Sequence, residues 1–164
     1  MLTKILSRNS CAKCRLCCVF DRYDLWETPS IENELREYIK SNIGDDIEYT
    51  PKGDMWLFKM KESKEDGLYR CPMLNDTGCI LGEKKPFECA IWPYRIMEVE
   101  GKRAISIAPI CDSVNALPLA TLLSFAKEIA PKIFAYADLH PDIIKPYDGT
   151  YPVLLFESDF KIEN

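Results

Sequence analysis

The spacing of hydrophobic residues predicts two helices. The first is expected over residues 29–43, because Thr28-Pro29 supplies an N-cap and a first-turn proline, and apolar side chains then recur every three or four positions toward Gly44. The second is expected over residues 119–130, where six apolar residues recur on one helical face. Pro131 follows directly, and it is expected to kink or stop this helix.

Strands are predicted as short segments outside these helices. Alternation within residues 55–60 favours one strand, and residues 94–107 favour a hairpin with its turn at Glu100-Gly101-Lys102. A further strand is expected within residues 151–156, and the tail beyond it is expected to fray. Residues 67–90 carry prolines and glycines that interrupt any long element and predict mostly loop. Together these elements predict an α+β fold of irregular topology, with two main helices and a small antiparallel sheet.

Length and composition predict one soluble domain. The chain has 164 residues, 47% of them hydrophobic, and no polar linker divides it, so residues 1–164 are expected to form a single domain. The first ten residues lack the apolar core of an export signal, and the longest apolar stretch, 116–126, is too short to span a bilayer. We therefore expect a cytoplasmic location and no membrane partner.

The charge balance argues against a nucleic-acid partner. Twenty-one basic residues stand against 26 acidic ones, for a net charge of −5, whereas proteins that bind nucleic acid broadly need a positive face. The first 22 residues are the exception, with five basic residues and one acidic residue. This basic segment contains the first cysteines, and positive charge there favours thiolates.

Eight cysteines are the unusual feature of the composition. Four form a CxxCxxCC run in the basic segment and four are dispersed further along: Cys11, Cys14, Cys17 and Cys18, then Cys71, Cys79, Cys89 and Cys111. Structural disulfides are rare in a reducing cytoplasm, so this framework is expected to bind metal or to perform redox chemistry. Two residues between cysteines allow a tight turn that aims both sulfurs at one metal. We therefore predict that residues 11–111 form a metal-binding region in which all eight cysteines are ligands and the metal staples the loops.

The spacing leaves the number of metal sites open. Cys11, Cys14 and Cys17 make a nearly complete site, and Cys71, which precedes a proline, is similar to the remote cysteine that closes ferredoxin-type sites. Adjacent side chains diverge along a chain, so Cys17 and Cys18 are not expected to share one mononuclear centre. Eight thiols allow two four-cysteine sites or one polynuclear site. Zinc and iron, including an iron–sulfur cluster, both accept thiolate ligands, and the metal stays open.

The order of the cysteine motifs resembles that of the CxxCxxCC cysteine-cluster family, a YkgJ-like group described as zinc- or iron-chelating domains, to which flagellin lysine N-methylases are related. The matching pieces lie within residues 11–111, and they are the CxxCxxCC run, Cys71-Pro72-Met73-Leu74, Gly78-Cys79-Ile80-Leu81, residues 85–93 (KPFECAIWP) and Cys111. The family often has arginine in place of Lys85, tyrosine in place of Leu81 and phenylalanine in place of Trp92. The resemblance implies metal binding by the cysteines and implies little about a reaction.

Two other classes of function stay open. One is an iron-dependent redox or group-transfer enzyme of the lysine-methylase kind, or its accessory protein, which the resemblance implies. The chain has no GxGxxG turn and no phosphate loop, so the accessory role is favoured. The other is a metal-free thiol–disulfide switch that uses the overlapping CxxC pairs. A Ser/His/Asp hydrolase is disfavoured because the only histidine, His140, lies outside the cysteine region. An unidentified protein partner is compatible with each of these functions.

Several residues beside the cysteines are minor candidates. The segment Trp92-Pro93-Tyr94-Arg95 directly follows the Cys89 motif, and its aromatic rings are expected to cover the metal site rather than to contact a substrate. Arg15 and Arg95 are expected to offset thiolate charge rather than to recognise an anion. Asp112 stands beside Cys111, where a turn or helix cap is favoured over an oxygen ligand.

Overall fold

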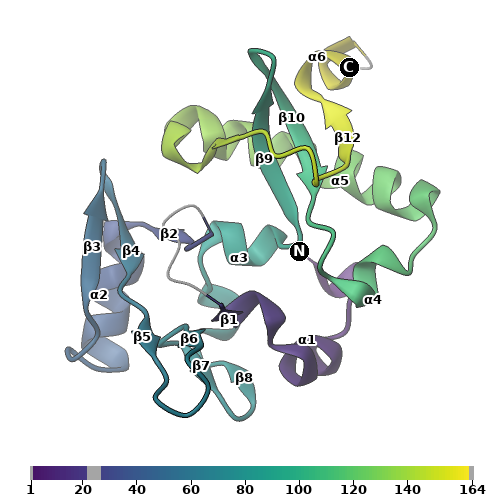
Figure 1. The fold of residues 1–164 in the computed structure, drawn as a ribbon. Coiled ribbons are helices and arrows are strands. Elements are labelled where there is room, and N and C mark those ends of the chain that lie inside the picture. The colour runs from purple at the N-terminus through teal and green to yellow at the C-terminus, as the bar shows by residue number, and fades with distance from the viewer. Residues whose placement is uncertain (1, 22–26, 163–164) are drawn as a thin grey trace. The chain divides into compact units, whose positions relative to one another are not determined.

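The chain forms two compact units. The structure is a computed structural model that describes residues 2–21 and 27–162 (Figure 1). One unit, the cysteine unit, is Ser7–Ala90, and the other, the C-terminal unit, consists of Met1–Leu6 and Ile91–Asn164. Both units combine helices with small sheets, so the predicted α+β class is confirmed. The predicted metal-binding region crosses the boundary, because seven of the cysteines lie in the cysteine unit and Cys111 lies in the C-terminal unit.

The cysteine unit is built from short elements. Its helices are α1 (Arg8–Cys14), η2 (Leu16–Cys18), α2 (Asn33–Asn42), η3 (Gly82–Lys84) and α3 (Phe87–Ile91), and its strands are β1 (Val19–Phe20), β2 (Ser30–Ile31), β3 (Tyr49–Lys52), β4 (Met55–Phe58), β5 (Lys61–Glu62), β6 (Tyr69–Arg70), β7 (Leu74–Asn75) and β8 (Gly78–Cys79). The strands pair in the orders β1-β6-β5, β2-β4-β3 and β7-β8, all antiparallel. The prediction that no long element forms within residues 67–90 is confirmed, since none exceeds five residues, but short helices and strands take up about half of the segment and the expectation of mostly loop is wrong.

Helix α2 begins later than the sequence predicts. The expected N-cap and first-turn proline, Thr28-Pro29, are buried outside the helix, and Ser30–Ile31 pairs with β4 instead. Ile31 is almost fully buried in the unit's core, so an extended segment gains more from packing than the first helical turn would. The end near Gly44 is confirmed, since the Gly44 amide donates to the carbonyl of Ile39.

One small hydrophobic core lies beneath the sheets and α2. Strand β4 is buried on both faces, so the imperfect alternation of residues 55–60 reflects packing on two sides. Cys71 is partly buried and packs against this core, which brings the candidate ligands next to the unit's main stabilising contacts. The buried members of the core are Ile31, Ile39, Phe58, Met73 and Leu81.

The C-terminal unit is built on longer elements. They are η1 (Leu2–Lys4), β9 (Tyr94–Val99), β10 (Lys102–Ile107), α4 (Asp112–Asn115), α5 (Leu119–Leu139), η4 (Pro141–Ile143), β11 (Lys145–Pro146), β12 (Val153–Phe156) and α6 (Glu157–Ile162). The predicted hairpin is confirmed as β9 and β10, and both turn residues, Glu100 and Gly101, have positive φ, as a type I′ turn requires. The predicted strand within residues 151–156 is confirmed as β12, and the sheet order is β11-β9-β10-β12.

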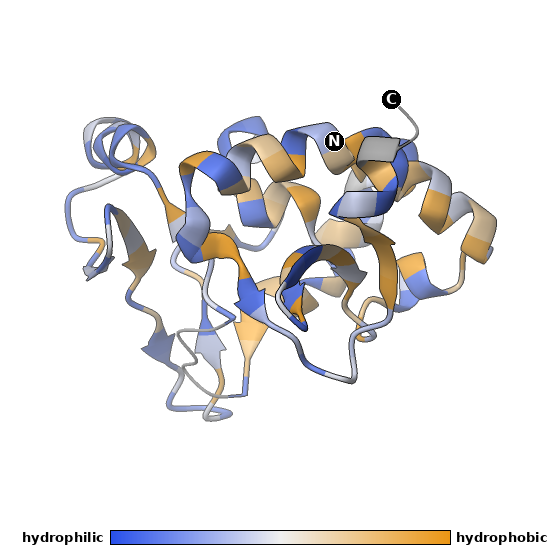
Figure 2. Cartoon of the chain, turned by 90° about the horizontal axis from the view of Figure 1, so that it is seen from above, coloured by the Kyte–Doolittle hydropathy of each residue, from blue (hydrophilic) through white to orange (hydrophobic). Residues whose placement is uncertain are grey.

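Helix α5 continues through Pro131 to Leu139, so of the two predicted effects of this proline, a kink or a stop, the stop at residue 130 is wrong. The buried face established before the proline continues after it with Ile133, Phe134 and Ala137, and their burial outweighs the loss of one helical hydrogen bond. Figure 2 shows that the helices carry both hydrophobic and hydrophilic residues, as expected of helices with one buried and one exposed face.

The tail is also more ordered than predicted. Residues 157–162 form α6, and only residues 163–164 of the tail lie outside the described part of the chain. Both carboxylate oxygens of Glu157 accept from the Arg103 guanidinium, at 2.7 and 2.6 Å, and Asp138 accepts from its remaining nitrogen at 2.6 Å. The ion pairs of Arg103 therefore connect β10 with α5 and α6, and they explain why the tail does not fray.

Candidate metal centre

Helix α1 carries the first two cysteines. The side chain of Ser7 caps the helix by accepting a hydrogen bond from the Ser10 amide at 3.1 Å. Cys11 and Cys14 are three residues apart, so they lie on one face of α1, one turn from each other. Both side chains are exposed.

Arg15 ends α1 and fastens it to the β7-β8 hairpin. Its backbone is left-handed, with φ 56°, and its guanidinium donates to the carbonyls of Ala12, at 2.9 Å, and Asp76. Gly78 also has positive φ, and a Cβ built there would lie 3.4 Å from the Cβ of Ala12, so helix and hairpin approach closely. Arg15 therefore has a positioning role that the sequence does not reveal.

Cys17 and Cys18 bring their sulfurs together. The two Sγ atoms are 3.9 Å apart, in the short turn η2. The prediction that these neighbours diverge is therefore wrong. That argument rests on the directions of the Cα–Cβ bonds, and rotation about those bonds brings both sulfurs to one side.

Cys71 faces this pair from the neighbouring strand. The β1-β6 ladder pairs Val19 with Arg70, and it continues by one position because the Cys71 amide donates to the carbonyl of Cys18 at 3.0 Å. Burial raises the pKa of the Cys71 thiol to about 12, and a hydrogen bond from the backbone of Met73 acts in the opposite direction. The negative charges of Cys79 and Cys17 raise this pKa further, which identifies them as near neighbours.

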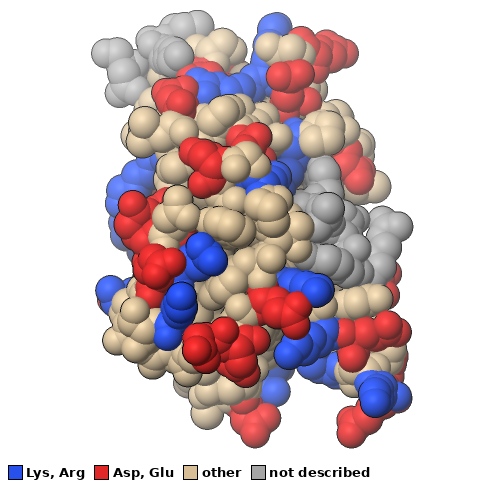
Figure 3. Space-filling view, turned by 90° about the vertical axis from the view of Figure 1, so that its left-hand side faces the viewer, with Lys and Arg blue, Asp and Glu red and all other residues tan. Residues whose placement is uncertain are grey.

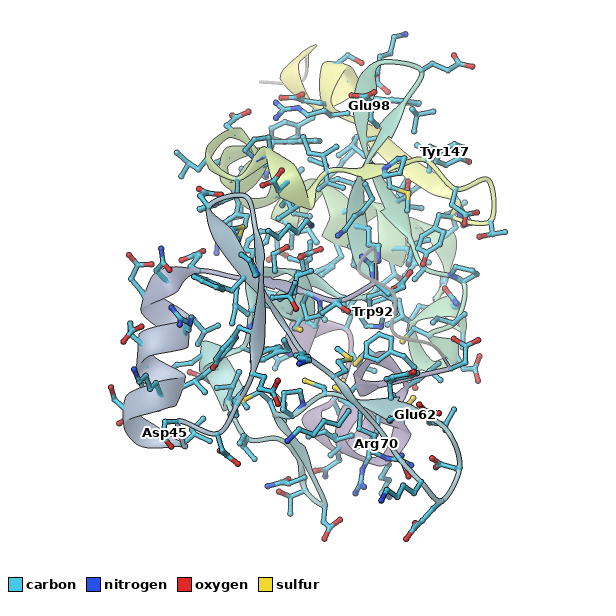
Figure 4. The ribbon with its side chains drawn as sticks, turned by 60° about the vertical axis from the view of Figure 1, so that its left-hand side comes forward. Asp45, Glu62, Arg70, Trp92, Glu98 and Tyr147 are labelled. Carbon is cyan, nitrogen blue, oxygen red and sulfur yellow. The ribbon has the colours of Figure 1, made fainter. Side chains whose placement is uncertain are left out.

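Cys79 and Cys89 complete a group of five thiols. Cys79 lies in β8 opposite Leu74, and Cys89 lies in α3, which is held to β2 because the Glu88 carboxylate accepts from the Ser30 amide at 2.6 Å. Burial raises the pKa of Cys89 well above its ordinary value, and the charges of the other thiols add to this effect. We call Cys17, Cys18, Cys71, Cys79 and Cys89 the five-thiol cluster. Figure 4 draws several sulfur atoms close together in the part of the cysteine unit that carries the labelled Glu62 and Arg70.

Lys85 is the cation that acts on this cluster. The pKa of Cys17 is raised, first by its hydrogen bond with Cys18, then by burial and by the Cys18 charge, while the charge of Lys85 lowers it. Cys17 is exposed as a residue, and its hydrogen bond with Cys18 is the main cause of this shift. The sequence predicts Arg15 and Arg95 for this electrostatic role and does not point to Lys85, although Lys85 opens the motif that contains Cys89.

The remaining predicted ligands are placed differently. Cys111 is nearly buried in the C-terminal unit, at the N-cap of α4, where its carbonyl accepts from the Val114 and Asn115 amides. None of the eight cysteines forms a disulfide. In residues 2–21 and 27–162, no three side chains of Cys, His, Asp or Glu are arranged to hold a metal ion together. Metal binding at the five-thiol cluster would therefore require side-chain rotation from the arrangement in this structure.

The minor candidates serve the C-terminal unit. Tyr94 is fully buried and packs on Phe125 with 5.5 Å between ring centroids, so it is a core residue of that unit. The Arg95 guanidinium lies over the Trp92 ring at 4.7 Å. Asp112 is the first residue of α4, whose N-cap is Cys111, so it lies at a helix terminus without being the cap.

The surface shows no patch of a single charge on the face drawn in Figure 3. Basic and acidic side chains are interspersed there and do not gather by sign. Among the helices in the described residues, none combines the length and apolar character needed to cross a membrane. Comparison of the chain with protein-family models, with curated proteins and with solved structures finds no significant match in any of the three.

Proposed function

We propose that the protein binds zinc through the five-thiol cluster. The observation that carries the proposal is the 3.9 Å separation of the Cys17 and Cys18 sulfurs. Two thiolates on one tetrahedral zinc, each about 2.3 Å from the ion, lie about 3.8 Å apart. The pair therefore has the separation of two ligands that share one ion, whereas in a [4Fe–4S] cluster each terminal thiolate binds an iron of its own.

Further ligands are available beside this pair. Opposed residues in an antiparallel ladder have Cβ atoms roughly 4.5–5.5 Å apart, so Cys71 can turn its sulfur toward the ion that Cys18 binds. Cys79 acts electrostatically on Cys71, and Cys71 and Cys17 act on the buried Cys89, which in this proposal supplies the fourth thiolate. A dication would replace the mutual repulsion of these thiolates by attraction, and the hydrogen bond from the Met73 backbone would stabilise the bound sulfur of Cys71.

The first experiment is elemental analysis of protein purified without oxygen. We expect zinc, with no acid-labile sulfide and no visible absorbance. Cys17→Ser and Cys89→Ser should lower the zinc content to well below half of the wild-type value, because each removes a thiolate from the cluster. Cys111→Ser is the matched control, since it makes the same change in the C-terminal unit, and it should leave the zinc content unchanged.

Other outcomes would change the assignment. Iron with sulfide would replace zinc by an iron–sulfur cluster at the same thiols. Loss of metal in Cys111→Ser would favour the eight-ligand version over the five-thiol cluster. Full metal content in both Cys17→Ser and Cys89→Ser would refute metal binding by the cluster.

A thiol–disulfide switch is the second candidate, and the same short sulfur separation favours it. Two thiols and one molecule of a peroxide such as hydrogen peroxide give one disulfide and two molecules of water, and Cys17 and Cys18 are close enough to react. Adjacent Cα atoms are about 3.8 Å apart, below the usual range for disulfides, so such a bond is strained and easily reduced. Eight titratable thiols in native protein that retains no metal, falling to six after one equivalent of peroxide, would favour the switch over zinc binding.

A further inference from the structure

The C-terminal unit exposes a stretch of surface that is apolar and nearly free of charge. Residues 109–124, which include α4 and the first turns of α5, carry one charged residue, Asp112, whereas 29% of the whole chain is charged. Two large apolar side chains of this segment are exposed, Ile110 at 48% and Leu119 at 61%. Smaller apolar residues beside them are exposed as well. We call the whole set the neutral face, and its members are Pro109, Ile110, Ala116, Pro118, Leu119 and Ala120.

The neutral face is continuous, although its residues come from three parts of the segment. The Asn115 side-chain amide donates to the carbonyl of Pro109 at 2.6 Å, which holds the residues before α4 against the end of that helix. Helix α4 then leads into α5, where the Thr121 amide donates to the carbonyl of Pro118 at 2.9 Å (Figure 1). Single exposed apolar residues are ordinary on a protein surface, whereas a contiguous group of them is typical of a contact site.

The rest of α5 shows that an exposed leucine alone does not make such a face. Leu139 is 73% exposed, but its neighbour Asp138 is paired with Arg103 at 2.6 Å. The middle of the helix is charged too, since Glu128 accepts from Lys4 at 2.6 Å. The exposed surface of α5 is therefore uncharged over its first turns and charged beyond them.

We propose that the neutral face binds a second copy of this chain, so that the protein forms a symmetric dimer. Two copies that meet about a twofold axis bring the same surface together, and that surface must complement itself. With a net charge of −5, two copies repel each other, and the neutral face is a place where they can bury apolar surface with little of this repulsion. All of its residues lie in the C-terminal unit, so the proposal does not depend on zinc binding.

The spacing of residues in α5 suits a contact between two copies of this helix. Leu119 and Leu123 are four residues apart and form a ridge, and the small residues Ala120 and Ser124 form a shallow row beside it. The leucine ridge of each copy can lie along the small residues of the other. Two helices that pack by such rows cross at about −50°. Leu119 is therefore expected near the centre of the contact.

The test measures the molecular mass of the full chain by sedimentation equilibrium over a wide range of protein concentration. A reducing agent keeps the exposed thiols from joining chains covalently. As the concentration rises, we expect the mass of the wild type to increase from that of one chain, 18.9 kDa, to twice that value. Leu119→Glu places a carboxylate from each copy in the contact, so it should raise the dissociation constant of the dimer about tenfold or more. An acidic residue is favourable in the first turn of a helix, so this variant should fold.

Two further variants accompany this one. Leu139→Glu is the matched control, because it makes the same change at an exposed leucine at the other end of α5, and it should dimerise as the wild type does. Ile110→Glu changes the neutral face outside any helix, and it should weaken the dimer even if Leu119→Glu does not fold. Sodium chloride screens the repulsion between the two negative chains, so it should strengthen the dimer, whereas it would weaken a contact made of ion pairs.

Several results would overturn the proposal. A single-chain mass at every concentration would refute self-association and leave the neutral face to a different partner. A dimer that is as tight in both Leu119→Glu and Ile110→Glu as in the wild type would have its contact elsewhere on the chain. The same conclusion would follow if Leu139→Glu weakened the dimer equally, or if salt weakened it.

Discussion

At the scale of single residues, burial controls the protonation of Tyr94. Its side chain is fully buried, and its hydroxyl donates to the carbonyl of Leu122 at 3.3 Å. Burial raises the pKa of this phenol from 10 to about 12, because the ionised form would lose its hydration inside the unit. The fold therefore holds the neutral phenol at a pH where an unfolded chain would already release the proton.

The stability of the protein should accordingly depend on pH through Tyr94. At pH 8 we expect Tyr94→Phe to lower the free energy of unfolding by about 1 kcal/mol, the contribution of one hydrogen bond. Between pH 10 and 12 the folded wild type binds one more proton than the unfolded chain, so its stability falls as pH rises. The variant lacks this dependence, and the difference between the two proteins should shrink or reverse by pH 11. Urea unfolding at pH 8 and pH 11 measures it, and a difference that does not vary with pH would contradict the prediction.

The thiol cluster shows which residue-level features a sequence reveals. The eight cysteines and their spacing predict thiolate chemistry, because two residues between cysteines allow a tight turn that aims both sulfurs at one metal. The approach of the Cys17 and Cys18 sulfurs depends on side-chain rotation, which spacing does not encode. The charge of Lys85 near Cys17 depends on tertiary packing between segments almost 70 residues apart, and it too becomes visible only in the fold.

At the scale of elements, the sequence predicts helices and strands well where hydrophobic residues recur regularly, and it predicts the ends of helices less well. The β9-β10 hairpin follows from alternation and a turn that Glu100-Gly101 can adopt, and the buried face of α5 follows from its spacing. Local rules for helix ends predict a helix start at Thr28-Pro29 and a helix end or kink at Pro131. Both interpretations fail because tertiary burial, of Ile31 in one case and of the last turns of α5 in the other, outweighs a local preference.

Helix α5 offers a direct measure of that balance. Pro131 is exposed and lacks the amide that would donate to the carbonyl of Lys127 in an unbroken helix. Replacing it with alanine should restore this bond, and we expect Pro131→Ala to raise the free energy of unfolding by about 2 kcal/mol, after allowing for the greater freedom of the unfolded chain. Lys132→Ala, the exposed neighbour in the helix, is the control and should change stability little. Equal or lower stability of Pro131→Ala in urea unfolding would contradict this account.

At the scale of the whole molecule, the two units are built from elements of different length. The C-terminal unit has a helix of 21 residues and a hairpin of two six-residue strands, which bury a continuous apolar face. The cysteine unit has strands of two to four residues and a core with five buried members. Short elements with a small core need a further source of stability, and ligation of a metal by thiolates is one that the five-thiol cluster can supply.

This contrast predicts that metal removal acts on one unit. If zinc binds the five-thiol cluster, its binding free energy contributes to the folding of Ser7–Ala90 and not to that of Ile91–Asn164. In hydrogen exchange followed by mass spectrometry, a chelator should speed exchange at least tenfold in peptides from residues 7–21 and 27–90, while peptides from α5 and the β9-β10 hairpin keep their wild-type rates. Cys17→Ser should reproduce the effect of the chelator, and Cys111→Ser should not. Equal acceleration in both units would mean that the metal stabilises the chain as a whole, and unchanged exchange in the cysteine unit would mean that its short elements are stable without metal.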